Sequence, residues 1–262
     1  VAYRLAGQGY DVAVLGKKEP GSQVCCTGII SQVCANAFAI DEGTILGRVR
    51  SARIFAPSGK LIELWRRENQ ACIINRSAFD VSMANRAQSN GAQYMPSSPA
   101  KSLTVEGDRV VVELTRGEAN LKIEARAAVV ATGFGTRLVE GLGKIGDFVI
   151  GAQAEVETRD IDEVEVYLGQ EIAPGFFAWL VPTSPPMARV GLLARRNPEF
   201  YIRKLLSSLH AQGKVVSDEE SPSYRGVPLQ PLARTYGERV LVVGDAAGQV
   251  KPTTGGGIYY GL

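Results

Sequence analysis

The residues best placed for chemistry lie in 244-GDAAGQVKPTTGGGIYYGL-262, at the end of the sequence. Asp245 follows the apolar run at 240–243, which predicts a buried parallel strand. The carboxyl end of such a strand is where open α/β sheets bind ligands. A carboxylate there can accept hydrogen bonds from the hydroxyl groups of a ribose or ribityl chain. A sharp turn with an N-capping aspartate is the alternative, and a lone Gly-Asp pair would favour that alternative.

Three consecutive glycines, Gly255, Gly256 and Gly257, precede Ile258, where the sequence predicts that a helix begins. Without side chains, their N–H groups can meet a phosphate or an anionic ring edge, and the helix dipole adds to the attraction. Gly-Asp-Ala-Ala followed at this spacing by the glycines therefore favours a ligand-binding bend over a plain turn.

A second group of residues, the aromatic and apolar run at 176–181, could form the wall of a dry slot for an oily substrate. A packed strand core is the alternative interpretation of this run. His210 is the only histidine, which excludes any mechanism that needs two imidazoles. The four cysteines have no metal-ligand spacing, and the adjacent Cys25 and Cys26 are not typical of a structural disulfide.

The elements that must position these residues begin with a helix at 1–6 and a strand at 10–15, separated by Gly7-Gln8-Gly9. This order is the second half of a βαβ unit, so we expect the opening strand and its G-x-G-x-x-G turn to be missing and the chain to be truncated at both ends. Residues 17–32 are predicted to be a loop, and 127–133 a central parallel strand that ends in the Gly133 turn.

Alternating strands at 149–157, 164–168, 176–181 and 188–193 predict an antiparallel sheet, followed by an amphipathic helix at 198–212. The fold class we predict is therefore α/β, a three-layer Rossmann-like domain with a parallel sheet, interrupted by a mostly antiparallel β domain. The predicted domains are a nucleotide-binding domain at 1–145, an antiparallel substrate domain at 146–234, and the return of the first domain at 235–262.

Composition limits the classes of function. Of the 262 residues, 45% are apolar and 21% charged, which is ordinary for a globular protein, and the net charge of +2 gives no basic field for nucleic acid. No stretch reaches the roughly 18 consecutive apolar residues of a membrane-spanning helix. The spacing of the cysteines, which is typical of neither a metal site nor a structural disulfide, favours a reducing cytoplasm.

Several of these motifs together resemble the geranylgeranyl reductase family, FAD-dependent oxidoreductases with the para-hydroxybenzoate hydroxylase fold. The bend at 244–262 resembles that fold's second flavin-binding motif. Asn75-Arg76-Ser77-Ala78-Phe79-Asp80 resembles the family's Arg-x-x-Phe-Asp helix start, and Cys25-Cys26-Thr27-Gly28 resembles its Cys-Gly-x-Gly loop. The most discriminating match is 174-PGFFAWLVP-182, which is similar to the family's Pro-x-x-Tyr-x-Trp-x-Phe-Pro substrate motif.

The resemblance implies that the protein binds FAD and reduces C=C bonds of a geranylgeranyl or other prenyl chain in isoprenoid biosynthesis, with hydride from the flavin and a proton from elsewhere. It implies a proton-donating or ring-packing role for Cys25 and substrate contacts for Phe177, Trp179 and Pro182. The residues it implies at the flavin are the following: Cys25, Cys26, Gly28, Arg76, Ala100, Gly133, Asp245, Gly256, Gly257 and Ile258.

Three departures from the family pattern bear on activity. Gly16 stands where the family has the glutamate that binds the adenosine ribose, so that carboxylate is missing, and Glu19 is the substitute we consider. Phe177 replaces the motif tyrosine and removes a hydroxyl. Cys26 replaces a glycine and leaves the cysteine register open by one residue; the spacing to Gly28 favours Cys25.

Two other functions stay open from the sequence: an FAD-dependent aromatic monooxygenase or halogenase, and a non-catalytic flavin- or lipid-binding protein. The partners we expect are a prenyl-chain substrate and an external electron donor, either NADPH or a ferredoxin, with no nucleic acid. We expect a cytoplasmic protein with peripheral membrane contact, on the ground that its substrate would be a lipid.

Overall fold

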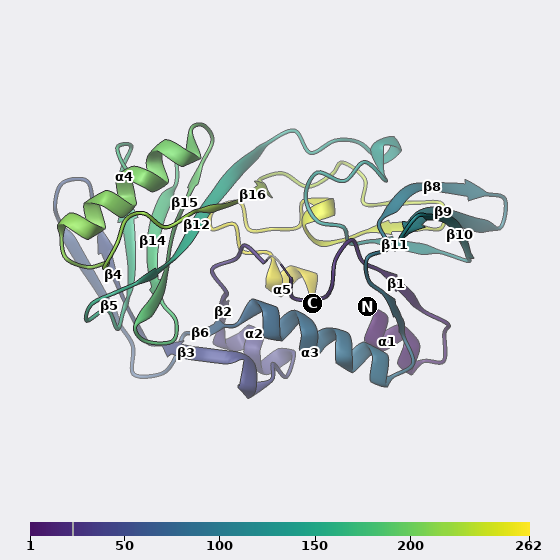
Figure 1. Ribbon diagram of the computed structural model, residues 1–262, viewed down its shortest axis with the longest axis horizontal. Coiled ribbons are helices and arrows are strands. Elements are labelled where there is room, and N and C mark those ends of the chain that lie inside the picture. The colour runs from purple at the N-terminus through teal and green to yellow at the C-terminus, as the bar shows by residue number, and fades with distance from the viewer. Residues whose placement is uncertain (23) are drawn as a thin grey trace.

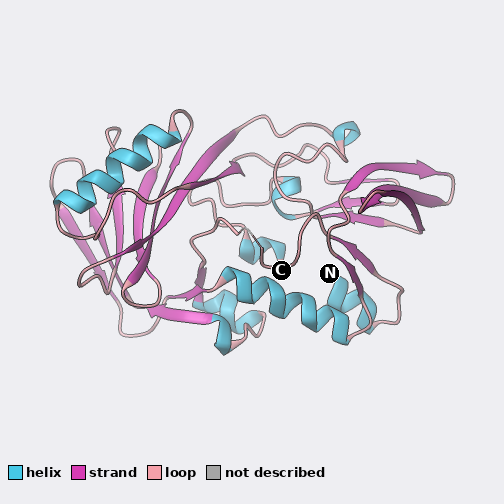
Figure 2. Ribbon diagram, viewed as in Figure 1, coloured by secondary structure: helices cyan, strands magenta, loops and turns pink. Residues whose placement is uncertain are grey.

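The computed structural model describes residues 1–22 and 24–262. Figure 1 shows a broad sheet covered by one long helix at one end of the molecule, and a mixed α/β part at the other end. Figure 2 shows the strands concentrated in these two parts, with long loops passing between them. The fold therefore has the two components that the sequence predicts.

The mixed part contains the expected parallel strands. Strand β1 (Ala13–Leu15) pairs in parallel with β7 (Gln93–Met95), and β11 (Ala128–Val130) pairs in parallel with β18 (Val240–Val242), with β17 (Tyr236–Gly237) at the edge. The prediction of a parallel α/β sheet is confirmed, although its strands fall into two short groups instead of one continuous sheet.

Helices and a β-meander cover the two faces of these parallel strands. Ala6 of α1 (Ala2–Gly7) and Ala87 of α3 (Arg76–Ser89) pack beside β1 and β7 on one face. On the other face, buried valines of the meander pack against Val130 and Val242. The meander consists of β8 (Ala100–Glu106), β9 (Arg109–Arg116) and β10 (Ala119–Ala125).

Seven strands form the large sheet, and α4 (Pro198–Ala211) covers one of its faces (Figure 1). The helix begins at Pro198, whose fixed φ and missing N–H suit a first helical position. Ile202, Leu205, Leu206 and Leu209 recur at helical spacing and are buried against this sheet. In spatial order the strands are β16 (Ser223–Pro228), β12 (Phe148–Glu157), β15 (Met187–Ala194), β14 (Phe177–Pro182), β13 (Val164–Leu168), β4 (Ser51–Phe55) and β5 (Leu61–Trp65).

The β4–β5 hairpin comes from the first 145 residues, yet it completes the large sheet. Strand β13 pairs in parallel with β4, with Glu165 opposite Arg53, while the other pairs of this sheet are antiparallel. Residues 51–65 thus lie with the antiparallel sheet in space, although the predicted domain 1–145 placed them with the nucleotide-binding part.

A buried ionic cluster secures this parallel junction. Glu165 is 2% exposed, and its carboxylate lies 2.6 Å from Lys214 Nζ and 3.5 Å from an Arg53 guanidinium nitrogen. The Tyr167 hydroxyl donates a hydrogen bond to the same carboxylate. Burial, together with this bond to an anion, raises the pKa of Tyr167 far above its ordinary value, so the hydroxyl keeps its proton.

Another small sheet lies between the two large parts, and it corrects one prediction. The order is β2 (Ile29–Ser31), β6 (Ala71–Ile74) and β3 (Ile45–Val49), all antiparallel. The prediction of an unbroken loop over 17–32 is therefore wrong at its end. Ser31 ends β2, and its hydroxyl accepts from Cys34 N to cap α2 (Gln32–Ala37).

Short helical turns complete the described chain: η1 (Glu42–Thr44), η2 (Glu140–Leu142), η3 (Gly244–Ala247) and α5 (Ile258–Gly261). In residues 1–22 and 24–262, no helix has both the length and the apolar character needed to cross a membrane.

Glu165→Gln should lower the free energy of unfolding by about 3–5 kcal/mol, because it leaves Lys214 and Arg53 near a neutral partner inside the sheet. Glu63→Gln is the matched control. Glu63 is 70% exposed and lies 3.9 Å from Arg53, so its loss should cost less than about 1 kcal/mol. Urea unfolding measures both, and equal losses would contradict the role given to the buried pair.

Candidate functional site

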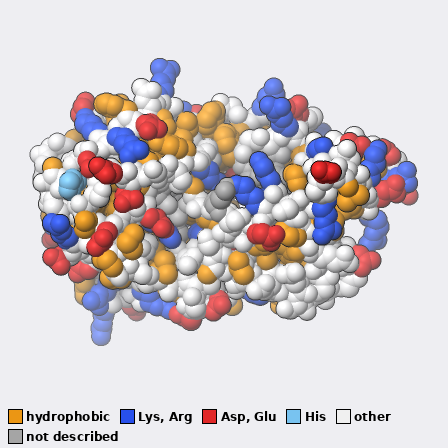
Figure 3. All heavy atoms as spheres, viewed as in Figure 1, with side chains coloured by type: hydrophobic (Ala, Val, Ile, Leu, Met, Phe, Trp, Pro, Cys, Tyr) orange, Lys and Arg blue, Asp and Glu red, His pale blue; other side chains and the backbone are white. Residues whose placement is uncertain are grey.

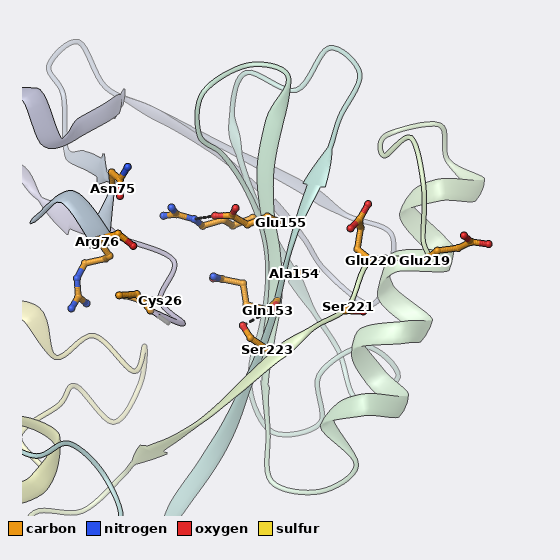
Figure 4. A pocket seen from close by; sticks show the side chains of 13 residues that line it. Cys26, Asn75, Arg76, Gln153, Ala154, Glu155, Glu219, Glu220, Ser221 and Ser223 are labelled. Carbon is orange, nitrogen blue, oxygen red and sulfur yellow. Dashed lines mark hydrogen bonds and ion pairs between the residues drawn. The ribbon is translucent and has the colours of Figure 1, made fainter. Parts of the chain in front are cut away.

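Two hollows lie between the mixed part and the large sheet. The larger encloses about 700 Å³ and the smaller about 280 Å³. Figure 4 shows the larger, with Cys26 and Arg76 on one side and Gln153 and Glu155 of strand β12 facing them. Most of the side chains around both hollows are polar, so neither hollow is itself the apolar slot that a prenyl chain needs.

Arg76 and Cys26 meet at the rim of the larger hollow. Asn75 caps α3 by accepting from Ala78 N at 3.1 Å, which sets Arg76 at the first helical position. The guanidinium donates to Asp80 at 2.9 and 3.1 Å. Burial would lower the pKa of Arg76, but attraction to Cys26 and Asp80 outweighs it and raises the pKa, so Arg76 stays a fixed cation.

Cys25 lines the smaller hollow, together with Gly133, Phe134 and Arg225. The two neighbouring cysteines thus face different hollows, Cys25 beside the loop that follows β11 and Cys26 beside Arg76. This arrangement brings the predicted Cys25 and Gly133 together. The role of either thiol remains a prediction.

Asp245 connects the glycine bend to the smaller hollow. It lies in η3 directly after β18, and its carboxylate is 3.5 Å from the guanidinium of Arg225, which lines that hollow. A Cβ added to Gly257 would come within 3.0 Å of Asp245 Oδ1 and 2.7 Å of a methyl carbon of Val250. The aspartate and the last glycine of the bend are therefore neighbours.

The bend leaves main chain open where a ligand could approach. A Cβ on Gly244 would meet nothing within 4 Å, and one on Gly256 would meet only the Thr254 hydroxyl at 3.4 Å. Gly244 and Gly255 also have φ values of +62° and +68°, which favour glycine. Ile258 anchors the far side by packing on a cluster that contains Ile74 and Phe79.

These features fit FAD. The side-chain-free segments at Gly244 and Gly256 can accommodate a phosphate or ring edge, and Asp245 offers a carboxylate to a hydroxyl-bearing chain. Arg76 and Arg225 each place a guanidinium at one of the hollows, where it can donate a hydrogen bond to a phosphate, although each is also paired with a carboxylate.

The other predicted residues lie elsewhere. Ala100 begins β8 and packs with the cluster around Val130 and Val242, away from both hollows. Gly28 sits against Ile74 at the end of β6. Phe177, Trp179 and Pro182 all belong to β14 and line neither hollow.

Trp179 lies on the face of the large sheet opposite α4. It packs against a cluster of Ile73, Val164 and Val181, and its ring lies over Gly191, where a Cβ would overlap it. Its ring centroid is 5.8 Å from that of Phe177. The indole Nε1 is buried and has no hydrogen-bond partner among the described residues.

Cross-strand register extends this face into an apolar row. Trp179 is opposite Val166, Val166 is opposite Ile54, and Ile54 is opposite Ile62 on the exposed edge strand. Paired residues share one face of a sheet, so the row leads from Gly191 to the sheet edge, over about 20 Å at the usual strand spacing.

Sequence reasoning missed Arg225, Phe134 and Arg189. The first two lie in irregular or edge segments whose contacts depend on the tertiary fold. Arg189 did carry a signal, because a charged residue interrupts the otherwise apolar strand β15. Figure 3 shows acidic and basic side chains interspersed over the visible face.

Comparisons with known proteins concern the sequence and the fold of the whole chain. No protein-family model matches the chain. Digeranylgeranylglycerophospholipid reductase of Methanocaldococcus jannaschii is 29% identical over 278 aligned residues, which cover 100% of this chain and 70% of that protein. The structure of a geranylgeranyl bacteriochlorophyll reductase-like protein from Thermoplasma acidophilum matches with a TM-score of 0.89 and 25% identity over 99% of this chain and 71% of that chain.

A more distant structure is the flavin-dependent halogenase CmlS, with a TM-score of 0.73 and 16% identity, covering 99% of this chain and 53% of that chain. At that identity the likeness concerns the fold alone. Fold and site together define the class: this is an FAD-dependent oxidoreductase fold with an interrupted nucleotide-binding domain. Within that class, the sequence is similar to digeranylgeranylglycerophospholipid reductases and the structure is similar to the geranylgeranyl bacteriochlorophyll reductase-like protein.

Gly257→Ala should weaken FAD binding by about 5- to 100-fold, because its Cβ would press on Val250 and displace Asp245. Titration of flavin fluorescence measures the dissociation constant. Gly141→Ala is the matched control, since a Cβ at Gly141 would meet nothing within 4 Å. Equal affinities for the two variants would contradict the placement of the cofactor at this bend.

Proposed function

We propose that this protein, loaded with FAD, reduces C=C bonds in the prenyl chains of an isoprenoid lipid. The observation that carries the proposal is the meeting of Cys25, Gly133 and the Arg225–Asp245 pair at one hollow that adjoins the glycine bend. Its relatives, named for reduction of a digeranylgeranylglycerophospholipid, support the choice of substrate class.

An isolated alkene is a poor acceptor because nothing beside it stabilises developing charge, so the reducing equivalent must come from a cofactor. Reduced FAD supplies a hydride when it is bound. The residues proposed to hold the cofactor act as binding and orienting groups: Arg76 as a fixed cation, Asp245 as an acceptor for hydroxyl groups, and Gly256 and Gly257 as open main chain.

The second carbon of the alkene must receive a proton, and Cys25 is the proton donor we propose. Its thiol lines the hollow beside Gly133 and is partly accessible, so it can exchange protons with solvent between turnovers. Phe177, Trp179 and Pro182 would position the chain along the apolar face and exclude water from it. Phe177 offers no hydroxyl for this purpose, so the motif position itself does not supply the proton.

Two further parts of the proposal concern partners. Reduction of each double bond consumes two electrons, so an external donor must regenerate the reduced cofactor, and NADPH and a reduced ferredoxin are the candidates. A lipid substrate also implies peripheral contact with a membrane. The alternative activity, an aromatic monooxygenase or halogenase, has fold-level support only.

Anaerobic incubation of the full chain with FAD, dithionite and a geranylgeranyl lipid should give products heavier by one H₂ for each double bond reduced, as measured by mass spectrometry. Cys25→Ser should slow this reduction by about 10²-fold or more, because it removes the proposed acid. Cys26→Ser is the matched control and should retain most activity. A greater loss in the Cys26 variant would move the role to that thiol, and an oxygen-dependent hydroxylated or halogenated product would reject the proposal.

A further inference from the structure

Arg189 on strand β15 is a buried cation that neither the sequence motifs nor the proposed mechanism uses. It is 8% exposed. Its Nε lies 3.1 Å from a carboxylate oxygen of Glu155 on the neighbouring strand β12, and the residue is also among those that line the larger hollow. Burying a guanidinium is costly unless it is paired and hydrogen-bonded, so its partners indicate what it does.

Its partners are the two loops that carry the candidate site. One terminal nitrogen of Arg189 donates to the carbonyl of Thr27 at 2.8 Å and to that of Ile74 at 3.2 Å. Thr27 directly follows Cys26, and Ile74 stands two residues before Arg76. A single side chain of the large sheet therefore holds both segments in place by hydrogen bonds to their main chain.

The packing around these bonds leaves little freedom. Ile74 N donates to Gly28 O at 2.9 Å, which joins the two segments to each other. A Cβ on Gly28 would come within 2.5 Å of Ile74 O and 2.8 Å of the Arg189 nitrogen. The Thr27 hydroxyl donates to Gln153 Oε1 on β12 at 3.0 Å, so the loop is held to the sheet at a second point.

We propose that Arg189 is a positioning residue that sets the cysteine loop and the start of α3 against the large sheet. This inference rests on the proposed function of that site, because the positions of the two loops matter for catalysis only if Cys25 and Arg76 act there as proton donor and cofactor-binding residue. Arg189 acts through main-chain carbonyls and has no direct part in the chemistry. Its forked guanidinium can meet Glu155 and both carbonyls together, whereas the single ammonium of lysine cannot reproduce that geometry.

The chain carries its own controls for a test by cysteine alkylation. Cys25 and Cys26 are partly exposed on the loop that Arg189 holds, while Cys34 and Cys72 are buried in the small sheet and its helix. In Arg189→Met, methionine retains much of the volume and removes every donor. Iodoacetamide labelling of the full chain without added FAD, followed by peptide mass spectrometry, gives the rate at each cysteine.

We expect Arg189→Met to raise the labelling rates of Cys25 and Cys26 by about 10- to 100-fold, because the loop loses a charged hydrogen-bond donor, with no change at Cys34 and Cys72. Arg189→Lys should give a smaller rise with the same selectivity, and it serves as the test if the methionine variant fails to fold. Arg195→Met, which removes the ion pair with Asp147 beyond the end of β15, should leave all four rates unchanged.

Unchanged labelling rates at Cys25 and Cys26 would overturn the proposal, because they would show that Arg189 does not restrain the loop. An equal rise at all four cysteines would also overturn it, because it would indicate general destabilisation of the fold. Steady-state kinetics adds an independent readout: Arg189→Met should lower kcat for prenyl reduction with little change in KM. The labelling needs neither flavin nor substrate. Selective labelling with no prenyl reduction in the parent protein would therefore uphold the positioning role and reject the proposed function.

Discussion

The parallel pairing of β13 with β4 is the constraint on which the rest of the structure depends. It inserts a hairpin from the first part of the chain into a sheet formed by the middle part, and the buried carboxylate of Glu165 meets Arg53 across the junction. The chain leaves the hairpin through β6 and enters α3 at Arg76. The register of that junction therefore fixes where the start of α3 lies relative to the large sheet.

Buried charged side chains lie on both faces of the large sheet, and each has a partner of opposite charge nearby. Glu165, Lys214 and Tyr167 satisfy one another on the α4 side of the sheet, away from the hollows. On the opposite side, Arg189 is paired with Glu155 and main-chain carbonyls, and Arg76 with Asp80. Buried charges on both sides of the sheet are thus paired with opposite charges or main-chain carbonyls close by. Polar groups can therefore line the hollows without the energetic cost of an unpaired buried ion.

Much of the fold could be predicted from the sequence because local patterns match the final elements. Asn75 as a helix cap and the alternation of small or apolar and polar residues at the end of β12 depend on neighbours in sequence, so they can be recognised without tertiary information. The pairing of β4 with β13 could not be predicted, since more than one hundred residues separate strands that are individually unremarkable. The same holds for Arg225, whose meeting with Asp245 depends on how β16 leaves the sheet. For the candidate site, the sequence indicated Cys25, Gly133 and Asp245, and the structure brings these residues close to one hollow. Their roles at a cofactor stay predictions.

The adjacent thiols of Cys25 and Cys26 have a consequence for comparing this protein with its relatives. Cys25 and Cys26 line separate hollows. A shift of one position in a sequence alignment therefore exchanges a cysteine beside Gly133 for a cysteine beside Arg76, while the aligned motif hardly changes. Equivalent cysteines in related proteins therefore have to be identified by the hollow that each one lines, because sequence position alone does not distinguish them.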